Sequence, residues 1–280
     1  MIDLLLTILC STSIAIILKV NSNISGNSIL LLAGNYFSAS VIGLFLFLYD
    51  QRATYSTELI PLGFFLSILF VGSIFAFSKS VNLSGAALST VSSRLSVFVP
   101  TILSMFFYLE LPNNYQILGL FLTLVTILLF YFSISNSDFR DGSKNKFVYL
   151  ISVLIGIGIA DFFMKVFQEN WLSTDKPFFL FWIFFFSFIS TFFITLKKKI
   201  KVEKKTIFLG LFMGIPNIFS SYFLIEALKT YEAVFVYPFV NMSIIIATAI
   251  IVKIFWKEYW STYSKVALLT GLASILLLSL

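Results

Sequence analysis

Apolar stretches of about twenty residues recur along the whole chain, and they limit its fold more than any other feature. Hydrophobic residues make up 59% of the sequence and charged residues 11%, whereas a soluble domain carries about 25% charged residues. A helix needs roughly 20 apolar residues to cross the ~30 Å hydrocarbon core of a bilayer. We therefore predict an all-α integral membrane protein with ten transmembrane helices, at residues 2–20, 29–49, 59–79, 85–108, 115–132, 147–166, 177–196, 206–228, 233–255 and 263–280.

The two halves of the chain resemble each other. Leu-Phe-Val-Gly at 69–72 recurs as Leu-Phe-Met-Gly at 211–214, and Phe-Tyr-Leu-Glu ending at Glu110 recurs as Phe-Trp-Lys-Glu ending at Glu258. Copies with an odd number of spans must cross the membrane in opposite directions, which is a common plan in transporters. We predict two inverted five-helix repeats, at 1–133 and 147–280, joined by a connecting loop at 134–146.

Composition also argues against several classes of function. The chain has one cysteine and no histidine, so neither an internal disulfide nor a Cys/His metal site is expected. Most lysines stand in short loops between spans, where they carry topology information and do not indicate nucleic-acid binding. No phosphate-binding GxxxxGK[ST] motif is present. We expect no cofactor, no nucleic-acid partner and no enzymatic activity.

Arg94 is the most unusual residue, because it lies within the predicted span 85–108. A charge near the bilayer centre costs at least about 2.5–3.5 kcal/mol, so it usually faces a partner or a watery cavity. The planar guanidinium suits a carboxylate or phosphate on a substrate. The alternative is a structural ion pair with Asp161 or Glu226, the acids within other spans. Each of these has a nearby lysine on its own helix, Lys165 at i+4 and Lys229 at i+3, a spacing that favours local pairing.

Hydroxyl side chains accompany Arg94 in the same stretch. Ser89 and Ser93 fall on one helical face, where they could line a polar wall for a substrate. The alternative is close helix packing, for which small hydroxyl residues are common in membranes. Pro100 should kink this helix, because proline lacks the amide that bonds to the preceding turn.

The second half offers a matching stretch around Asn241. The offset between the two glutamate motifs aligns Ser93 with Asn241 and Arg94 with Met242. We therefore expect Arg94 and Asn241 to lie at similar depth, with Asn241 and Tyr237 as substrate-binding candidates. The alternative for Asn241 is an interhelical hydrogen bond, worth about 1 kcal/mol or less in membranes.

Further candidates are polar residues in other spans. Asn217 follows a Gly-Ile-Pro sequence at which we predict a second helix break, and Asn35 and Tyr36 are expected to point inward from the second span. Asp161 and Glu226 are possible sites for a coupling ion, with local pairing to lysine as the alternative.

Together these features resemble the ten-helix EamA-like branch of the drug/metabolite transporter superfamily, and a bacterial subgroup within it. The resemblance is carried by the two five-span halves and by Glu110 and Glu258, each of which closes a span before a short turn and a small-residue helix. Gly34-Asn35-Tyr36 and the Ser93–Ser96 segment leading to Pro100 add to it. It implies spans 1, 3, 4, 6, 8 and 9 around a central cavity, with spans 5 and 10 at the periphery.

We expect a secondary transporter of the bacterial inner membrane, monomeric or homodimeric, that moves a small polar metabolite by alternating access. An amino acid or other carboxylate is the leading substrate class, because one deep cation matches one anionic group. An organophosphate or nucleotide-sugar exchanger stays open, although it would need more deep cations than Arg94 and Lys79. A lipid-modifying membrane enzyme ranks last, because the acids are scattered. Which side of the membrane holds the termini also stays open, since the loop lysines and the resemblance favour opposite answers.

Overall fold

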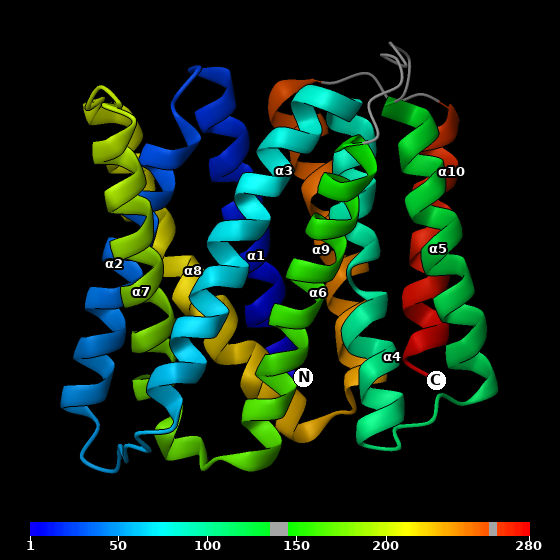
Figure 1. The fold of residues 1–280 in the computed structure, drawn as a ribbon. Helices are drawn as coiled ribbons and strands as arrows, with labels where there is room; N and C mark the ends of the chain where they lie inside the picture. Colours follow the sequence, from blue (N-terminus) through cyan, green and yellow to red (C-terminus); the bar gives the residue numbers. More distant parts are fainter. Residues whose placement is uncertain (135–144, 258–261) are drawn as a thin grey trace. The chain divides into compact units, whose positions relative to one another are not determined.

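The computed structural model describes residues 1–134, 145–257 and 262–280, without the side chains of residues 85–87, 133–134 and 145–146. Every regular element in these ranges is helical (Figure 1). The helices are α1 (Ile2–Asn23), α2 (Ser28–Tyr49), α3 (Leu59–Leu95), α4 (Phe98–Phe107), α5 (Asn114–Ile134), α6 (Asn145–Asn170), the short 3₁₀ helix η1 (Ser173–Asp175), α7 (Lys176–Lys197), α8 (Lys204–Thr230), α9 (Ala233–Trp256) and α10 (Thr262–Leu278).

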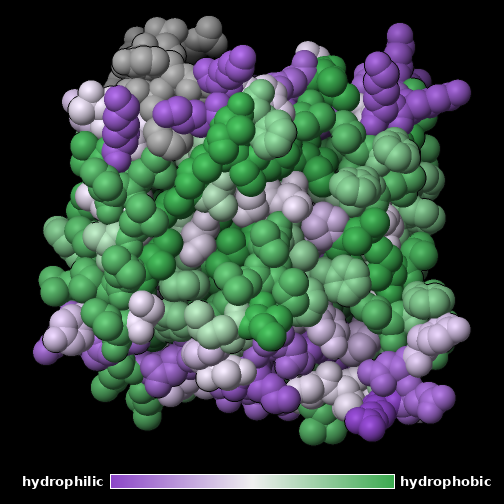
Figure 2. Space-filling model, turned by 180° about the vertical axis from the view of Figure 1, so that it is seen from behind, coloured by the Kyte–Doolittle hydropathy of each residue, from purple (hydrophilic) through white to green (hydrophobic). Residues whose placement is uncertain are grey.

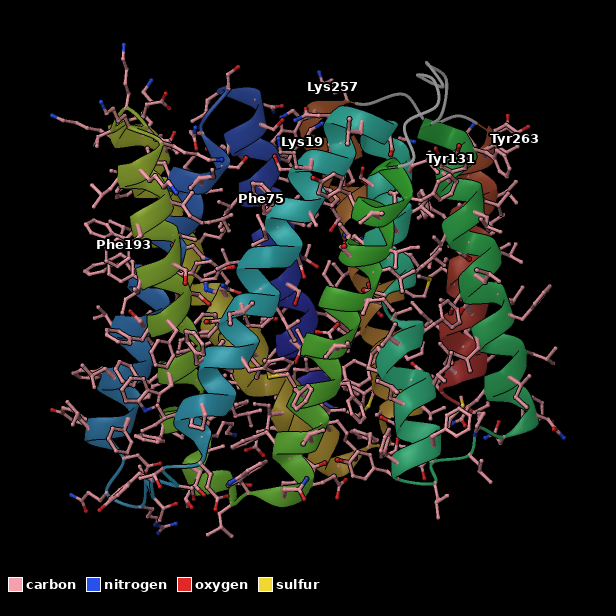
Figure 3. All side chains as sticks on the ribbon, in the orientation of Figure 1. Lys19, Phe75, Tyr131, Phe193, Lys257 and Tyr263 are labelled. Atoms are coloured by element: carbon pink, nitrogen blue, oxygen red, sulfur yellow. The ribbon has the colours of Figure 1, made fainter. Side chains whose placement is uncertain are left out.

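These helices confirm the prediction of an all-α integral membrane protein. In the described ranges, nine helical stretches are long and apolar enough to cross a bilayer, and α10 is a shorter apolar helix. Large hydrophobic side chains face outward along them; Phe193 projects from α7 with 64% of its surface exposed (Figure 3). On the face drawn in Figure 2, hydrophobic residues dominate the middle of the helices and hydrophilic residues gather toward their ends. The chain is a multi-pass membrane protein.

The described chain forms two compact units, and each unit takes segments from both predicted halves of the sequence. Unit 1 comprises residues 1–71 and 166–229, and unit 2 comprises residues 72–165 and 230–280. Helices α3 and α6 contribute to both units. These units do not coincide with the predicted repeats at 1–133 and 147–280. The repeats were inferred from resemblance between two sequence segments, which compactness does not test, so they stay a prediction. Most of the connecting loop, at 135–144, lies outside the described residues.

In unit 1, close backbone packing joins α2 to α7 and α8. Helices α2 and α7 lie side by side (Figure 1). On the other side of α2, a Cβ atom at Gly210 of α8 would meet the Leu31 carbonyl oxygen at 2.3 Å, and one at Gly214 would meet the Asn35 carbonyl oxygen at 2.5 Å. Small residues that let helix backbones approach are typical of membrane interfaces. This contact fixes the register of Asn35 against α8.

In unit 2, α5 and α10 form a second tightly packed pair (Figure 1). Hydroxyl groups join them, at 2.8 Å between Thr123 and Ser274 and 2.9 Å between Thr126 and Thr270. Tyr131 near the end of α5 and Tyr263 at the start of α10 lie at the same end of the pair (Figure 3), so the two helices are antiparallel. Such interhelical hydrogen bonds satisfy polar groups where water is absent.

Helix α3 reverses direction within unit 2. Ser80 Oγ donates a hydrogen bond to Ser89 Oγ at 2.7 Å, although nine residues of straight helix would span about 13–14 Å. The chain therefore folds back between these two serines, as Figure 1 shows for α3. The predicted spans 59–79 and 85–108 exist, but they join through helical turns and not through a loop.

Pro100 interrupts the next segment, as predicted. Helix α3 ends at Leu95 and α4 begins at Phe98. The Ser96 carbonyl, which would accept from the amide that proline lacks, instead accepts from the Val99 N–H at 3.0 Å. The break predicted at 214–217 was wrong, because α8 continues through Pro216. Gly214, in the same turn, packs against α2, and proline is tolerated in membrane helices where neighbouring groups satisfy the freed backbone.

Candidate functional site

The predicted site residues divide between the two units. Unit 2 contains the polar residues of α3, α6 and α9: Ser89, Ser93, Arg94, Asp161, Tyr237 and Asn241. Unit 1 contains the polar residues of α2 and α8: Asn35, Tyr36, Asn217 and Glu226. Glu258, which marked the second glutamate motif, lies outside the described residues.

Arg94 lies beside Asn241, as the sequence offset predicted. It occupies the last turn of α3, directly before the break caused by Pro100. Its Nη1 donates to Asn241 Oδ1 at 3.5 Å, at the long end of hydrogen-bond distances. Within the part of unit 2 that the structure describes, no carboxylate forms an ion pair with Arg94. The remaining guanidinium N–H groups are therefore available for a ligand.

Ser89 and Ser93, near Arg94, accept hydrogen bonds from other serines of α3 and of the turn that follows it. Ser89 is buried, and its hydroxyl accepts from Ser80 across the turn of α3. The carbonyl of Ser93 accepts from Ser96 Oγ at 2.6 Å. The contact of the Ser89 hydroxyl matches the packing alternative, while the contact of Ser93 involves its backbone alone.

Tyr237 connects α9 to α6. It is buried, and its hydroxyl donates to the backbone carbonyl of Asp161 at 2.5 Å. The backbone N–H of Lys165 interacts with the same hydroxyl. An α-helix joins the carbonyl of one residue to the N–H four residues on, so Tyr237 engages α6 at the one turn that carries Asp161 and Lys165. Asn241 is one turn further along α9, on the same face as Tyr237.

Local pairing of Asp161 with Lys165, the alternative to a coupling role, is not the ion pair found among the described residues. Lys165 Nζ instead lies 2.9 Å from Glu110 Oε1, and both side chains are buried. The other oxygen of Glu110 accepts the N–H of Val234 at 3.2 Å. A carboxylate at a helix N-terminus satisfies a free amide and interacts favourably with the helix dipole. Glu110 thus anchors the start of α9.

The side chain of Asp161 has no partner among the described residues. Its backbone carbonyl accepts from Tyr237, but no described residue forms an ion pair or hydrogen bond with its side chain. The sequence contains one indication that Asp161 could lack a cation. Both Asp161 and Glu110 could pair with Lys165, and one lysine cannot neutralise two acids. Nothing in the sequence shows that Lys165 reaches Glu110, because this contact depends on how α4 packs against α6.

In unit 1 the predicted candidates bond to each other or to the hydrophobic core. Asn217 Nδ2 donates to Asn35 Oδ1 at 3.1 Å, and Asn35 is buried. The ring of Tyr36 is also buried and stacks on Phe184, with ring centroids 6.2 Å apart. These contacts favour a role in holding α2, α7 and α8 together.

Glu226 has a partner that the sequence did not indicate. It forms an ion pair with Lys176, at the start of α7. Lys176 is 1% exposed, and its Nζ lies 3.6 Å from the centroid of the Tyr222 ring. A cation over an aromatic face gains further stabilisation. Lys176 directly precedes the predicted span 177–196, so the sequence alone does not indicate that it is buried.

Unit 1 also contains an apolar cavity of about 440 Å³ between α1 and α8. Its lining consists mostly of aromatic and aliphatic side chains, namely Cys10, Ser13, Phe212, Ile215, Pro216, Phe219 and Phe223. None of the predicted site residues lines it. Among the described residues, no cluster of three or more histidine, cysteine, aspartate or glutamate side chains could hold a metal ion.

Comparisons with known proteins support the fold and a distant relationship. No family model matches the chain. An uncharacterized protein of Haemophilus influenzae is 23% identical over 284 residues, which cover 98% of this chain and 96% of that protein. A solved crystal structure of a protein superposes with a TM-score of 0.80 at 10% identity, covering 99% of this chain and 94% of that chain. The chain therefore has a full-length distant homologue and a helical fold that is already known from experiment.

Proposed function

We propose that the protein is a secondary transporter that moves a small polar metabolite across the membrane by alternating access. The observation that carries this proposal is Arg94, a cation at the end of a membrane helix whose described contact is one long hydrogen bond to Asn241. Membrane proteins rarely keep such a charge unless a substrate, ion or cavity uses it.

The chemistry around Arg94 favours a substrate with one anionic group. A guanidinium binds a carboxylate through two parallel N–H···O bonds, which are charge-assisted and therefore strong. The Asn241 amide lies beside it and could hold a neighbouring polar group of the same molecule. We therefore favour an amino acid or other carboxylate over a nucleotide sugar or organophosphate, whose additional charges would need further cations.

The wider transport cycle follows from the resemblance to the EamA-like branch and is part of the proposal. Two inverted halves that rock about a site near the membrane midplane would expose the site to each side in turn. The sequence has no ATP-binding motif, so an ion gradient or substrate exchange would drive this cycle. We place the protein in the bacterial inner membrane, where such carriers act on metabolites.

The test is a ligand screen of the purified protein by thermal unfolding. A ligand that binds only the folded state stabilises it by about 2.7 kcal/mol at 100 times its Kd. We expect carboxylates from a panel of amino acids, organic acids, sugars, nucleotides and polyamines to raise the Tm of the wild type but not of Arg94→Ala. Carboxylates that stabilise both proteins equally would remove Arg94 from the site.

Transport itself is measured in proteoliposomes with the radiolabelled compound that stabilises the protein most. Arg94→Ala should abolish uptake while the protein still inserts and elutes as a single species in size-exclusion chromatography. Uptake by Arg94→Ala at the wild-type rate would contradict the proposed mechanism.

A further inference from the structure

Two acids compete for one lysine in unit 2. Lys165 Nζ lies 2.9 Å from Glu110 Oε1, while Asp161 stands one helical turn before Lys165 on α6. Residues at this spacing are neighbours on a helix surface and can form an ion pair. Lys165 therefore has a second carboxylate within reach on its own helix, without any movement of the backbone.

Asp161 is too deep in its helix to remain a free carboxylate. It lies nine residues before the end of α6 at Asn170, which corresponds to about 13–14 Å of helix. An uncompensated charge at such depth is costly in a membrane. No described residue neutralises the side chain. A proton is the smallest ligand that would do so.

We propose that Asp161 is the proton-binding residue of the transporter, and that Lys165 moves between Glu110 and Asp161 as this proton leaves and returns. The proposal rests on the proposed transport function and names its coupling ion. The described arrangement, with Lys165 on Glu110, corresponds to the protonated form of Asp161. When the proton leaves, the new negative charge attracts Lys165, and Glu110 loses its cation.

This exchange acts on the helix that carries Asn241. Glu110 holds the start of α9 through the Val234 N–H, and Tyr237 holds the next turn of α9 to the Asp161 carbonyl. Both hydrogen bonds involve groups in contact with the α6 turn that carries Asp161 and Lys165, where the charge would change. Loss of the proton would therefore loosen the start of α9 and shift Asn241, the partner of Arg94. Proton binding and substrate binding would be linked through one helix.

Lys165 is the cation proposed for this exchange, because the other charged and titratable groups of the surrounding helices lie elsewhere or are not cationic. Arg94 of α3 is directed to Asn241, and Lys79 of α3 lies 5.9 Å from the centroid of the Phe75 ring. Glu110 and Tyr108 after α4 and Tyr237 on α9 are acidic or phenolic, and Lys253 lies in the last turn of α9, at the opposite end of that helix from Tyr237.

The first test needs no transported substrate. Infrared spectroscopy of the purified protein detects the carbonyl band of a protonated carboxylic acid. We expect this band in the wild type at neutral pH, its loss in Asp161→Asn, and its retention in the control Glu169→Gln, which changes an exposed acid on the same helix. A spectrum of Asp161→Asn that keeps the full band would overturn the proposal.

Glu110→Gln tests the exchange of Lys165. This variant removes the competing acid, so the charged form of Asp161 no longer competes with Glu110 for Lys165. The acid band should then disappear at a lower pH than in the wild type. The same pH dependence in both proteins would show that Lys165 does not exchange, since a purely structural Glu110–Lys165 pair has no effect on Asp161.

Proteoliposomes separate coupling from transport. With a radiolabelled amino-acid mixture as the probe, Asp161→Asn should retain exchange of internal for external probe but lose accumulation driven by a pH gradient, by tenfold or more. A trapped pH-sensitive dye should report proton flux for the wild type alone. Accumulation by Asp161→Asn at the wild-type level would overturn proton coupling and leave the proposed function standing. A wild type that moves no probe would instead contradict that function, while the infrared result still decides the proton site.

Discussion

The polar groups on the membrane helices of the two units are satisfied in different ways. In unit 1, Lys176 pairs with Glu226 and lies over the Tyr222 ring, and Asn217 bonds to Asn35. In unit 2, Arg94 contacts an amide at 3.5 Å, and Asp161 has no described side-chain partner. Polar groups with complementary partners stabilise a membrane protein and fix its packing. Charges without such partners destabilise it, and their presence indicates a function that uses them. Substitutions in the two units should therefore affect different properties.

The largest effect is expected in unit 1, for Lys176→Met. Lys176 is the buried member of its ion pair with Glu226, and removing one partner of a buried ion pair costs up to about 3–5 kcal/mol. We expect a large drop in the Tm of the detergent-solubilised protein. The double variant Lys176→Met/Glu226→Gln should recover most of this loss, because no buried charge then remains. A single variant that melts with the wild type would show that the pair does not stabilise unit 1.

Arg94→Lys in unit 2 should instead leave stability unchanged and weaken ligand binding. Lysine keeps the charge but lacks the planar fork that binds a carboxylate at two points. One lost charge-assisted hydrogen bond corresponds to about 1.5–3 kcal/mol, or roughly a 10- to 100-fold weaker Kd. Isothermal titration with the stabilising carboxylate measures this change. A wild-type Kd would mean that the charge alone matters.

Asn241→Ala should have a smaller effect on the same site. Its hydrogen bond to Arg94 is long, and interhelical hydrogen bonds in membranes are worth about 1 kcal/mol or less. We expect a Kd weakened by no more than about fivefold. A loss as large as that of Arg94→Ala would show that Asn241 contacts the substrate more closely than Arg94 does.

The smallest effect is expected for Asn217→Ala in unit 1. Loss of the bond to Asn35 should cost about 0.6 kcal/mol, which lowers Tm by roughly 1–2 °C. Uptake in proteoliposomes should stay at the wild-type rate. Loss of uptake at unchanged Tm would place Asn217 in the site and weaken the contrast between the units.

The sequence predicted well those features that depend on composition and on chain offset. Hydropathy located the helices because the bilayer thickness sets their length. The offset between the glutamate motifs predicted Arg94 and Asn241 at similar depth, and their side chains are in contact. Pro100 broke its helix for a purely local reason. None of these predictions needed knowledge of which helices touch.

The sequence failed where contacts between helices compete with local ones. An ion pair at i, i+4 contributes only about 0.2–0.5 kcal/mol. The packing of α4 against α6 therefore allows Lys165 to pair with Glu110 and not with Asp161. Glu226 joined Lys176 of another helix for the same reason. The turn of α3 was expected as a loop, because no local pattern shows that Ser80 and Ser89 would meet.

Cys10 is the one cysteine of the 280-residue chain, and it borders the apolar cavity between α1 and α8. The protein therefore carries a natural attachment point for a thiol-reactive fluorophore or spin label, and no background cysteine has to be removed first. This point lies in unit 1, while Arg94, Asp161 and Asn241 all lie in unit 2. A label on Cys10 can thus report on the cavity during turnover while the residues proposed to bind substrate and proton keep their native side chains.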